Sequence, residues 1–184
     1  MRCSVAQIPN FEAVEWFWQI EPVSKYLELV LAEDIRFATS FRKEELHEFD
    51  HNACRFSTSD ASIYCAFRDK FKLLPLNEEQ QFRLAINGTV AEKYARPMAS
   101  KSWYFKTKPT SDVMPFDVGD YVTVQAEQQG LYLVLETDDV ASILMLISKV
   151  HKIDELRTIC CGKTIRVHND RVSSFPYEIQ EHQL

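Results

Sequence analysis

Residues 76–97 read LNEEQQFRLAINGTVAEKYARP, and this stretch decides the fold because it predicts one complete amphipathic helix. Asn77 can cap the start of the helix, and Gln80 stands three residues later, as a capping box requires. Apolar residues then recur at helical spacing. Gly88 costs about 1 kcal/mol relative to alanine inside a helix, and Pro97 ends the element.

The sequence before this helix predicts a second helix and a small sheet. The apolar residues that share one helical face are Ile63, Phe67, Phe71 and Leu74, and Pro75 follows them. Aromatic and branched residues, separated by turn-like breaks, predict strands over residues 16–20, 26–31 and 35–39. We expect a three-stranded meander covered by a helical hairpin.

After Pro97 the sequence pattern changes from helical to alternating. Short runs rich in branched and aromatic residues predict strands over residues 103–107, 121–127, 131–137, 142–150 and 163–167. The expected fold class is α+β. A mixed α/β N-terminal domain covers residues 1–97, and a β-rich C-terminal domain, built as a curled sheet or small barrel, covers residues 98–184.

The composition of the chain excludes several classes of protein. Of its 184 residues 46% are hydrophobic, which is enough for a packed core. No apolar run approaches the roughly 20 residues that a membrane-spanning helix needs. The start does not read as a secretory signal and the five cysteines lack regular spacing, so we expect a cytoplasmic protein. The net charge of −6 argues against general binding to nucleic-acid phosphates.

The sequence contains neither a glycine-rich phosphate loop nor a tight catalytic motif, so we expect no enzyme activity and no cofactor. A hydrolase that uses Cys160 or Cys161 with His168 is the weakest alternative, because a nucleophilic thiol needs a base and an orienting group. His47 and His51 lie four residues apart among acidic residues, but polar segments of this kind are mostly solvated surface. We therefore expect no metal site.

One segment has the composition of a binding surface. Between Lys93 and Lys108 the chain carries five basic residues and no acidic one. Within it, Lys101–Phe105 interleaves a cation with aromatic residues, a pattern that can stack nucleic-acid bases. On a strand, Trp103 and Phe105 would share one face. That face could pack in the core instead of binding a partner. A nucleic-acid-binding module that uses this strand is the alternative function.

Five segments together resemble the ZapC family of bacterial cell-division proteins, in the same order and at similar spacing. They are residues 61–67, 76–80, 94–97, 101–105 and 169–171, which read ASIYCAF, LNEEQ, YARP, KSWYF and NDR. The resemblance spans roughly residues 16–172 and departs from the family at Cys65, where an aromatic residue is expected. It implies a non-enzymatic cytoplasmic adaptor, recruited to the division site at midcell, that binds FtsZ directly, bundles its protofilaments and suppresses its GTPase activity.

Two sets of residues are candidates for partner binding under this resemblance. A basic patch of Arg96, Lys101 and Arg171 would complement an acidic filament. Leu29 and Phe67 are candidates for an apolar groove, with core packing as the other interpretation. Bundling requires either two binding surfaces on one protomer or self-association. The resemblance favours a monomer with one surface in each domain.

Overall fold

The computed structural model describes residues 15–47, 53–96, 98–99, 102–108 and 116–175. Its first sheet is antiparallel and has the strand order β3-β2-β1-β4. The strands are β1 (Phe17–Ile20), β2 (Tyr26–Ala32), β3 (Ile35–Arg42) and β4 (Ala53–Arg55). The predicted meander is confirmed as β1 to β3, and β4 is a further strand that the sequence pattern did not predict.

Alternation of side chains gives this sheet one apolar face. Trp18 and Leu29 are partners across β1 and β2, and both are fully buried. Ile20 and Leu27 form a second buried pair on the same two strands. Because successive side chains of a strand point to opposite faces, these four residues share the face that packs against the helices.

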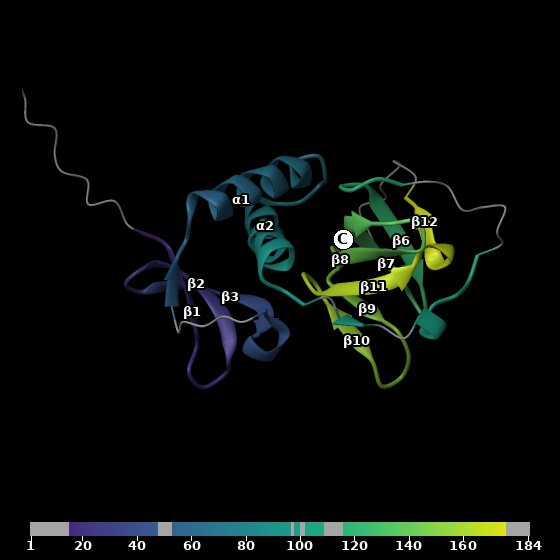
Figure 1. Ribbon diagram of the computed structural model, residues 1–184, viewed down its shortest axis with the longest axis horizontal. Helices are drawn as coiled ribbons and strands as arrows, with labels where there is room; N and C mark the ends of the chain where they lie inside the picture. The colour runs from purple at the N-terminus through teal and green to yellow at the C-terminus, as the bar shows by residue number, and fades with distance from the viewer. Residues whose placement is uncertain (1–14, 48–52, 97, 100–101, 109–115, 176–184) are drawn as a thin grey trace, which may run out of the picture.

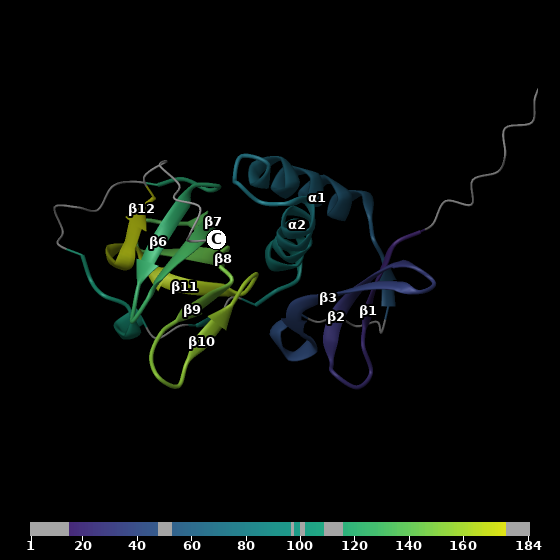
Figure 2. The same cartoon turned by 180° about the vertical axis from the view of Figure 1, so that it is seen from behind.

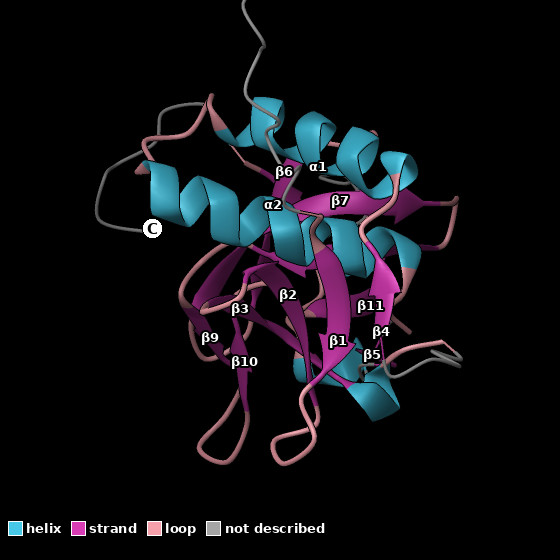
Figure 3. Ribbon diagram, turned by 90° about the vertical axis from the view of Figure 1, so that its left-hand side faces the viewer, coloured by secondary structure: helices cyan, strands magenta, loops and turns pink. Residues whose placement is uncertain are grey.

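Both predicted helices are present, as α1 (Thr58–Phe71) and α2 (Glu78–Lys93). The capping box of α2 is confirmed, since the amide of Gln80 donates to Asn77 Oδ1 and the amide of Asn77 donates to Gln80 Oε1, each over 2.9 Å. The helices lie side by side above the first sheet (Figure 3). Of the helices in the described residues, neither is long and apolar enough to cross a membrane.

α2 lies between the two sheets of the molecule, as Figures 1 and 2 show from opposite sides. Every residue from Leu84 to Val90 is buried, so this part of the helix has no side that faces solvent. One apolar cluster joins Trp18 of the first sheet and Phe67 of α1 to Leu133 and Met145 of the second sheet. The two halves of the chain therefore share a core around α2.

The second sheet has the strand order β12-β6-β7-β8-β11-β5. Its strands are β5 (Met98–Ala99), β6 (Tyr121–Gln125), β7 (Gln129–Thr137), β8 (Ala141–Leu146), β11 (Thr164–His168) and β12 (Val172–Ser174). β5 runs parallel to β11, and the other neighbours are antiparallel. A separate ribbon pairs β9 (Val150–Lys152) with β10 (Thr158–Cys160).

The α+β class is confirmed, but the expected curled sheet or small barrel is not found in the described part of the chain. The sheet ends at β12 and β5, which do not pair with each other. Both of its faces are nevertheless covered. Leu131 and Leu133 of β7 join the core around α2, whereas Tyr132 and Val134 join a second cluster that includes Phe105. A sheet covered on both faces buries its apolar strands without closing into a barrel.

Polar contacts also join the two halves. The Ser40 hydroxyl of the first half donates to Cys161 O of the second over 2.7 Å. Within the first half, the Ser40 amide donates to Asn87 Oδ1 of α2, also over 2.7 Å. Lys163 of the second half forms an ion pair with Glu45 of the first. Pro97 lies outside the described residues, and the division into domains at 1–97 and 98–184 stays a prediction.

Gly88 lies where α2 packs on α1, and a Cβ at this position would be 2.8 Å from the ring of Phe67. We expect Gly88→Ala to lower the free energy of unfolding by about 1–3 kcal/mol. Overpacking on this scale outweighs the roughly 1 kcal/mol that alanine contributes inside a helix. Urea unfolding measures the change, and Phe67→Leu in the same background should recover part of the loss. A more stable Gly88→Ala protein would contradict the packing argument.

Candidate functional site

The side chain of Arg171 joins two short 3-10 turns, η2 (Ser102–Tyr104) and η4 (Asn169–Arg171). Its Nη1 donates to the carbonyl oxygens of Ser102 and Phe105 over 3.0 and 2.6 Å. Its Nε donates to Asp170 Oδ1 over 3.3 Å. The side chain is 20% exposed. Arg171 therefore fixes the backbone of η2 and keeps part of its charge at the surface.

The η2 turn replaces the strand that we predicted over residues 103–107, and that prediction is wrong. Phe105 is buried, and its ring stacks on His151 with the centroids 6.1 Å apart. Trp103, by contrast, is 69% exposed. Residues two apart share a face on a strand but not in a turn of three residues. Core packing is thus confirmed for Phe105 and wrong for Trp103.

Tyr104 lies between these two residues and carries a cation on its ring. Cζ of Arg157 lies 3.9 Å from the centroid of the Tyr104 ring, and Arg157 Nη1 lies 3.2 Å from Asp154 Oδ2. A guanidinium at this distance is attracted to the face of the ring. Arg157 belongs to the connection between β9 and β10, and our sequence reasoning missed it because no linear pattern relates it to Tyr104.

The structure accounts for part of the predicted basic patch. Arg171 contacts the carbonyl of Ser102, the residue after Lys101, but Lys101 itself lies outside the described residues. Arg96 is exposed, and its amide donates to Glu45 O over 2.7 Å. No hydrogen bond or ion pair found in the described residues joins Arg96 to Arg171. A single cationic surface made by all three residues stays a prediction.

Both residues of the predicted apolar groove lie in the core around α2. Leu29 of β2 is fully buried, and Phe67 of α1 is 5% exposed. The ring of Phe67 stacks on Phe71 with the centroids 6.1 Å apart. This arrangement agrees with core packing, the other interpretation that we considered. Partner binding by Leu29 and Phe67 stays a prediction.

A cleft of about 510 Å³ separates the start of α2 from the second half, and Cys160 and Cys161 line it. Burial raises the pKa of the Cys161 thiol to about 11, although nearby Arg83 opposes the increase. A thiol that keeps its proton at neutral pH is a poor nucleophile. His168 ends β11, where it is paired with Ala141. The Cys161 thiol donates to Ile147 O over 3.4 Å, and no hydrogen bond found among the described residues joins His168 to Cys160 or Cys161, so the predicted hydrolase pair is not seen.

The histidines that we considered as metal ligands are not brought together with further ligands. His47 is exposed, and His51 lies outside the described residues. Within the described ranges there is no group of three or more His, Cys, Asp or Glu side chains that could hold a metal ion.

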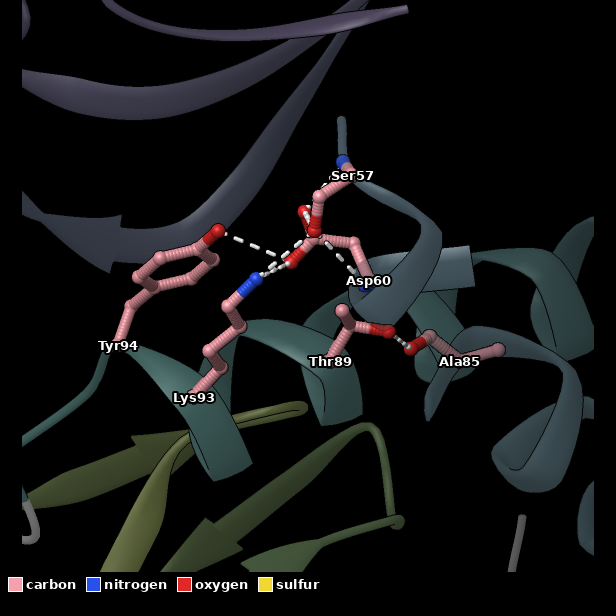
Figure 4. A network of polar contacts seen from close by, with 6 residues as sticks. All are labelled: Ser57, Asp60, Ala85, Thr89, Lys93 and Tyr94. Atoms are coloured by element: carbon pink, nitrogen blue, oxygen red, sulfur yellow. Dashed lines mark hydrogen bonds and ion pairs between the residues drawn. The ribbon is translucent and has the colours of Figure 1, made fainter. Parts of the chain in front are cut away.

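Asp60 is fully buried at the first turn of α1 and links it to the end of α2 (Figure 4). Its Oδ2 accepts hydrogen bonds from the amide and the hydroxyl of Ser57, each over 2.6 Å. Its Oδ1 accepts from Lys93 Nζ over 2.7 Å and from the Tyr94 hydroxyl over 2.9 Å. Burial alone raises the pKa of this carboxyl, but the hydrogen bonds from Lys93 and Ser57 outweigh it and lower the pKa. Asp60 is thus a structural anchor, because its oxygens are already occupied.

His151 of β9 is fully buried beneath the η2 turn. Its Nε2 lies 3.1 Å from Gln128 O, which can only accept, so Nε2 carries the proton. Nδ1 then accepts from the Tyr132 hydroxyl over 2.6 Å. Burial lowers the pKa of His151 and outweighs the opposite effect of Gln128. The histidine is therefore held neutral between β7 and the residue that anchors η2, Phe105.

Comparison with known proteins identifies relatives over most of the chain. Residues 12–96 match the family model described as "Cell-division protein ZapC, N-terminal", and residues 97–178 match the one described as "Cell-division protein ZapC, C-terminal". The chain is 30% identical over 174 residues to the "Cell division protein ZapC" of Xenorhabdus bovienii, covering 89% of each chain. It is 28% identical over 171 residues to the protein of the same name from Shewanella oneidensis, covering 91% of this chain and 94% of the relative. It is also 28% identical over 160 residues to the protein of the same name from Aliivibrio salmonicida, covering 86% of this chain and 88% of the relative.

We expect Asp60→Asn to lower the free energy of unfolding by about 3 kcal/mol, because it leaves Lys93 beside a buried group without charge. The matched control is Asp69→Asn on the same helix, which removes an exposed ion pair with Lys72 and should cost less than about 1 kcal/mol. Urea unfolding of both variants makes the comparison. Equal losses would show that the burial of Asp60 carries no special weight.

We also expect the stability of the protein to fall as the pH is lowered through the ordinary histidine pKa of 6.5. The pKa of His151 is lower in the folded chain than in the unfolded chain, so the unfolded chain binds a proton more readily. Acid therefore stabilises the unfolded chain relative to the folded one. Thermal melts between pH 7.5 and 5.5 measure this slope. The double variant Tyr132→Phe/His151→Leu removes the titrating group and its partner together. An unchanged slope in that variant would assign the acid sensitivity to other groups.

Proposed function

This chain belongs to the ZapC family of cell-division proteins, which are not enzymes, and we propose that it binds FtsZ directly, stabilises and bundles FtsZ protofilaments in the Z ring, and suppresses FtsZ GTPase activity. The observation that carries this proposal is the match of family models to both halves, over residues 12–96 and 97–178. The proposed place of action is the cytoplasm at midcell. The proposed form is a monomer without a cofactor.

The geometry of the η2 turn supports a protein-binding role. Arg171 holds the turn through two carbonyl oxygens, and Phe105 anchors it in the second core. A surface that is ordered before binding loses little conformational entropy when a partner arrives. Arginine and aromatic side chains are also the residues that most often dominate the energy of protein interfaces.

The nucleic-acid alternative assumed that Lys101–Phe105 forms a strand of a curled sheet. The residues of this segment that the structure describes form a turn instead. Exposed Trp103 can still stack on a base. Its ring centroid lies 5.7 Å from that of Tyr104, and the Arg157 guanidinium lies over the Tyr104 ring. The alternative therefore rests on these side chains alone, against a net charge of −6.

Bundling by a monomer requires one filament-binding surface in each half of the chain. The η2 region is the proposed surface of the second half. Leu29 and Phe67 are the predicted surface of the first half, but both are buried, so any variant at these positions must first be shown to fold. Suppression of GTPase activity follows by linkage if the protein binds the assembled filament more tightly than the free subunit.

Cosedimentation with purified FtsZ and GTP tests the proposal directly. We expect the protein to pellet with the polymer, the polymer to appear as bundles in electron micrographs, and phosphate release by FtsZ to fall. Bovine serum albumin in place of this protein is the control for trapping in the pellet. A protein that stays in the supernatant at micromolar concentration and low salt would refute the proposal.

Variants of Arg171 separate the effect of its charge from the effect of its hydrogen bonds to Ser102 and Phe105. Arg171→Glu should abolish bundling and also lower the melting temperature, because the hydrogen bonds to Ser102 and Phe105 are lost. Arg171→Lys keeps the positive charge, but an ammonium group cannot reproduce the hydrogen bonds that the planar guanidinium makes to the two carbonyl oxygens. Arg166→Glu applies the same charge change on β11 as a control. Normal bundling by Arg171→Glu would remove this residue from the proposed surface.

A further inference from the structure

Trp103 is unusual among the tryptophans of this chain. It is 69% exposed, whereas Trp18 is fully buried and Trp16 is packed against the first core. An indole ring has a large apolar surface, and leaving it in water forgoes the free energy of burial. Tryptophan is among the residues that most often supply the binding energy of protein interfaces.

The position of Trp103 is fixed from both sides of the turn. Ser102 precedes it and Phe105 follows two residues later, and Arg171 binds the carbonyl oxygens of both. Phe105 lies in the second core against His151. Tyr104 is held beneath the Arg157 guanidinium. The exposed ring thus projects from a rigid support, and its exposure is not the result of a loose loop.

The neighbours of Trp103 give the surface its chemical character. Its ring centroid lies 5.7 Å from that of Tyr104, which also contacts Arg157 and packs against the second core. Leu156, the residue before Arg157, is 91% exposed. Lys106 and Lys108 follow in the same segment. Arg157 is already paired with Asp154, whereas the lysines follow Trp103 closely in the chain and Lys106 is exposed. An exposed aromatic residue flanked by lysines has the composition of an interface hot spot that recognises an acidic protein surface.

We propose that Trp103 is the anchor residue of the filament-binding surface: its indole inserts into an apolar pocket of the partner filament, where Lys106 and Lys108 pair with carboxylates at the rim of that pocket. This inference rests on the proposed function and extends it. It names the residue that supplies binding energy, whereas Arg171 positions the turn that carries that residue.

The test compares Trp103→Ala with Leu73→Ala in quantitative cosedimentation with FtsZ and GTP. Leu73, two residues after α1, is 72% exposed, so the control removes an apolar side chain of similar exposure from the other half. We expect Trp103→Ala to raise the apparent Kd for the filament at least tenfold and to leave the melting temperature within about 2 °C of wild type, because an exposed side chain contributes little to the fold. Trp103→Phe should bind with intermediate affinity. Leu73→Ala should bind like wild type.

Each outcome separates this inference from the function on which it rests. If wild type pellets with FtsZ and Trp103→Ala pellets equally well, the anchor is wrong and the proposed function stands. If wild type does not pellet, both are wrong. A final measurement tests the nucleic-acid alternative by titrating the protein against a fluorescein-labelled 20-nucleotide oligothymidylate. Tight, strongly salt-dependent binding of this probe that Trp103→Ala removes, with normal pelleting by that variant, would assign the surface to nucleic acid and overturn the inference.

Discussion

The burial of α2 on all sides is the constraint on which the rest of the structure depends. A helix without a solvent-facing side must be enclosed, and the first sheet covers only part of its surface. The second sheet completes the enclosure. Asn87, a polar residue in this buried stretch, is satisfied at the junction, where Oδ1 accepts from the Ser40 amide and Nδ2 donates to Arg83 O over 2.8 Å. Gly162 packs against the Asn87 side chain in a left-handed conformation, with φ +82, and leaves no room for a Cβ.

The exposed surface around η2 depends in turn on the second core. The Tyr132 hydroxyl holds His151, and His151 stacks on Phe105, the last anchor of the turn. Arg171 closes the same turn from the side of η4. A surface residue is therefore placed by a buried histidine and a half-buried arginine.

Sequence patterns predicted the elements that are long or that carry their own chemical signals. The Asn77–Gln80 capping box located α2, and alternation with turn residues located β6 to β8. The short strands β4, β10 and β12 were missed because three residues are too few to show alternation. The family resemblance pointed to Arg171 but not to its hydrogen bonds with the carbonyl oxygens of Ser102 and Phe105. Arg157 and the exposure of Trp103 depend on contacts between distant segments, which no local pattern encodes.

The shared core around α2 also bears on the mechanics of a bundled array. A flexible linker between two binding surfaces would let neighbouring filaments drift apart and slide. Here the connection runs through a buried helix, the Ser40–Cys161 hydrogen bond and the Glu45–Lys163 ion pair. A protomer with one filament on each half would therefore act as a stiff spacer, and the distance between filaments would be set by the thickness of the protein.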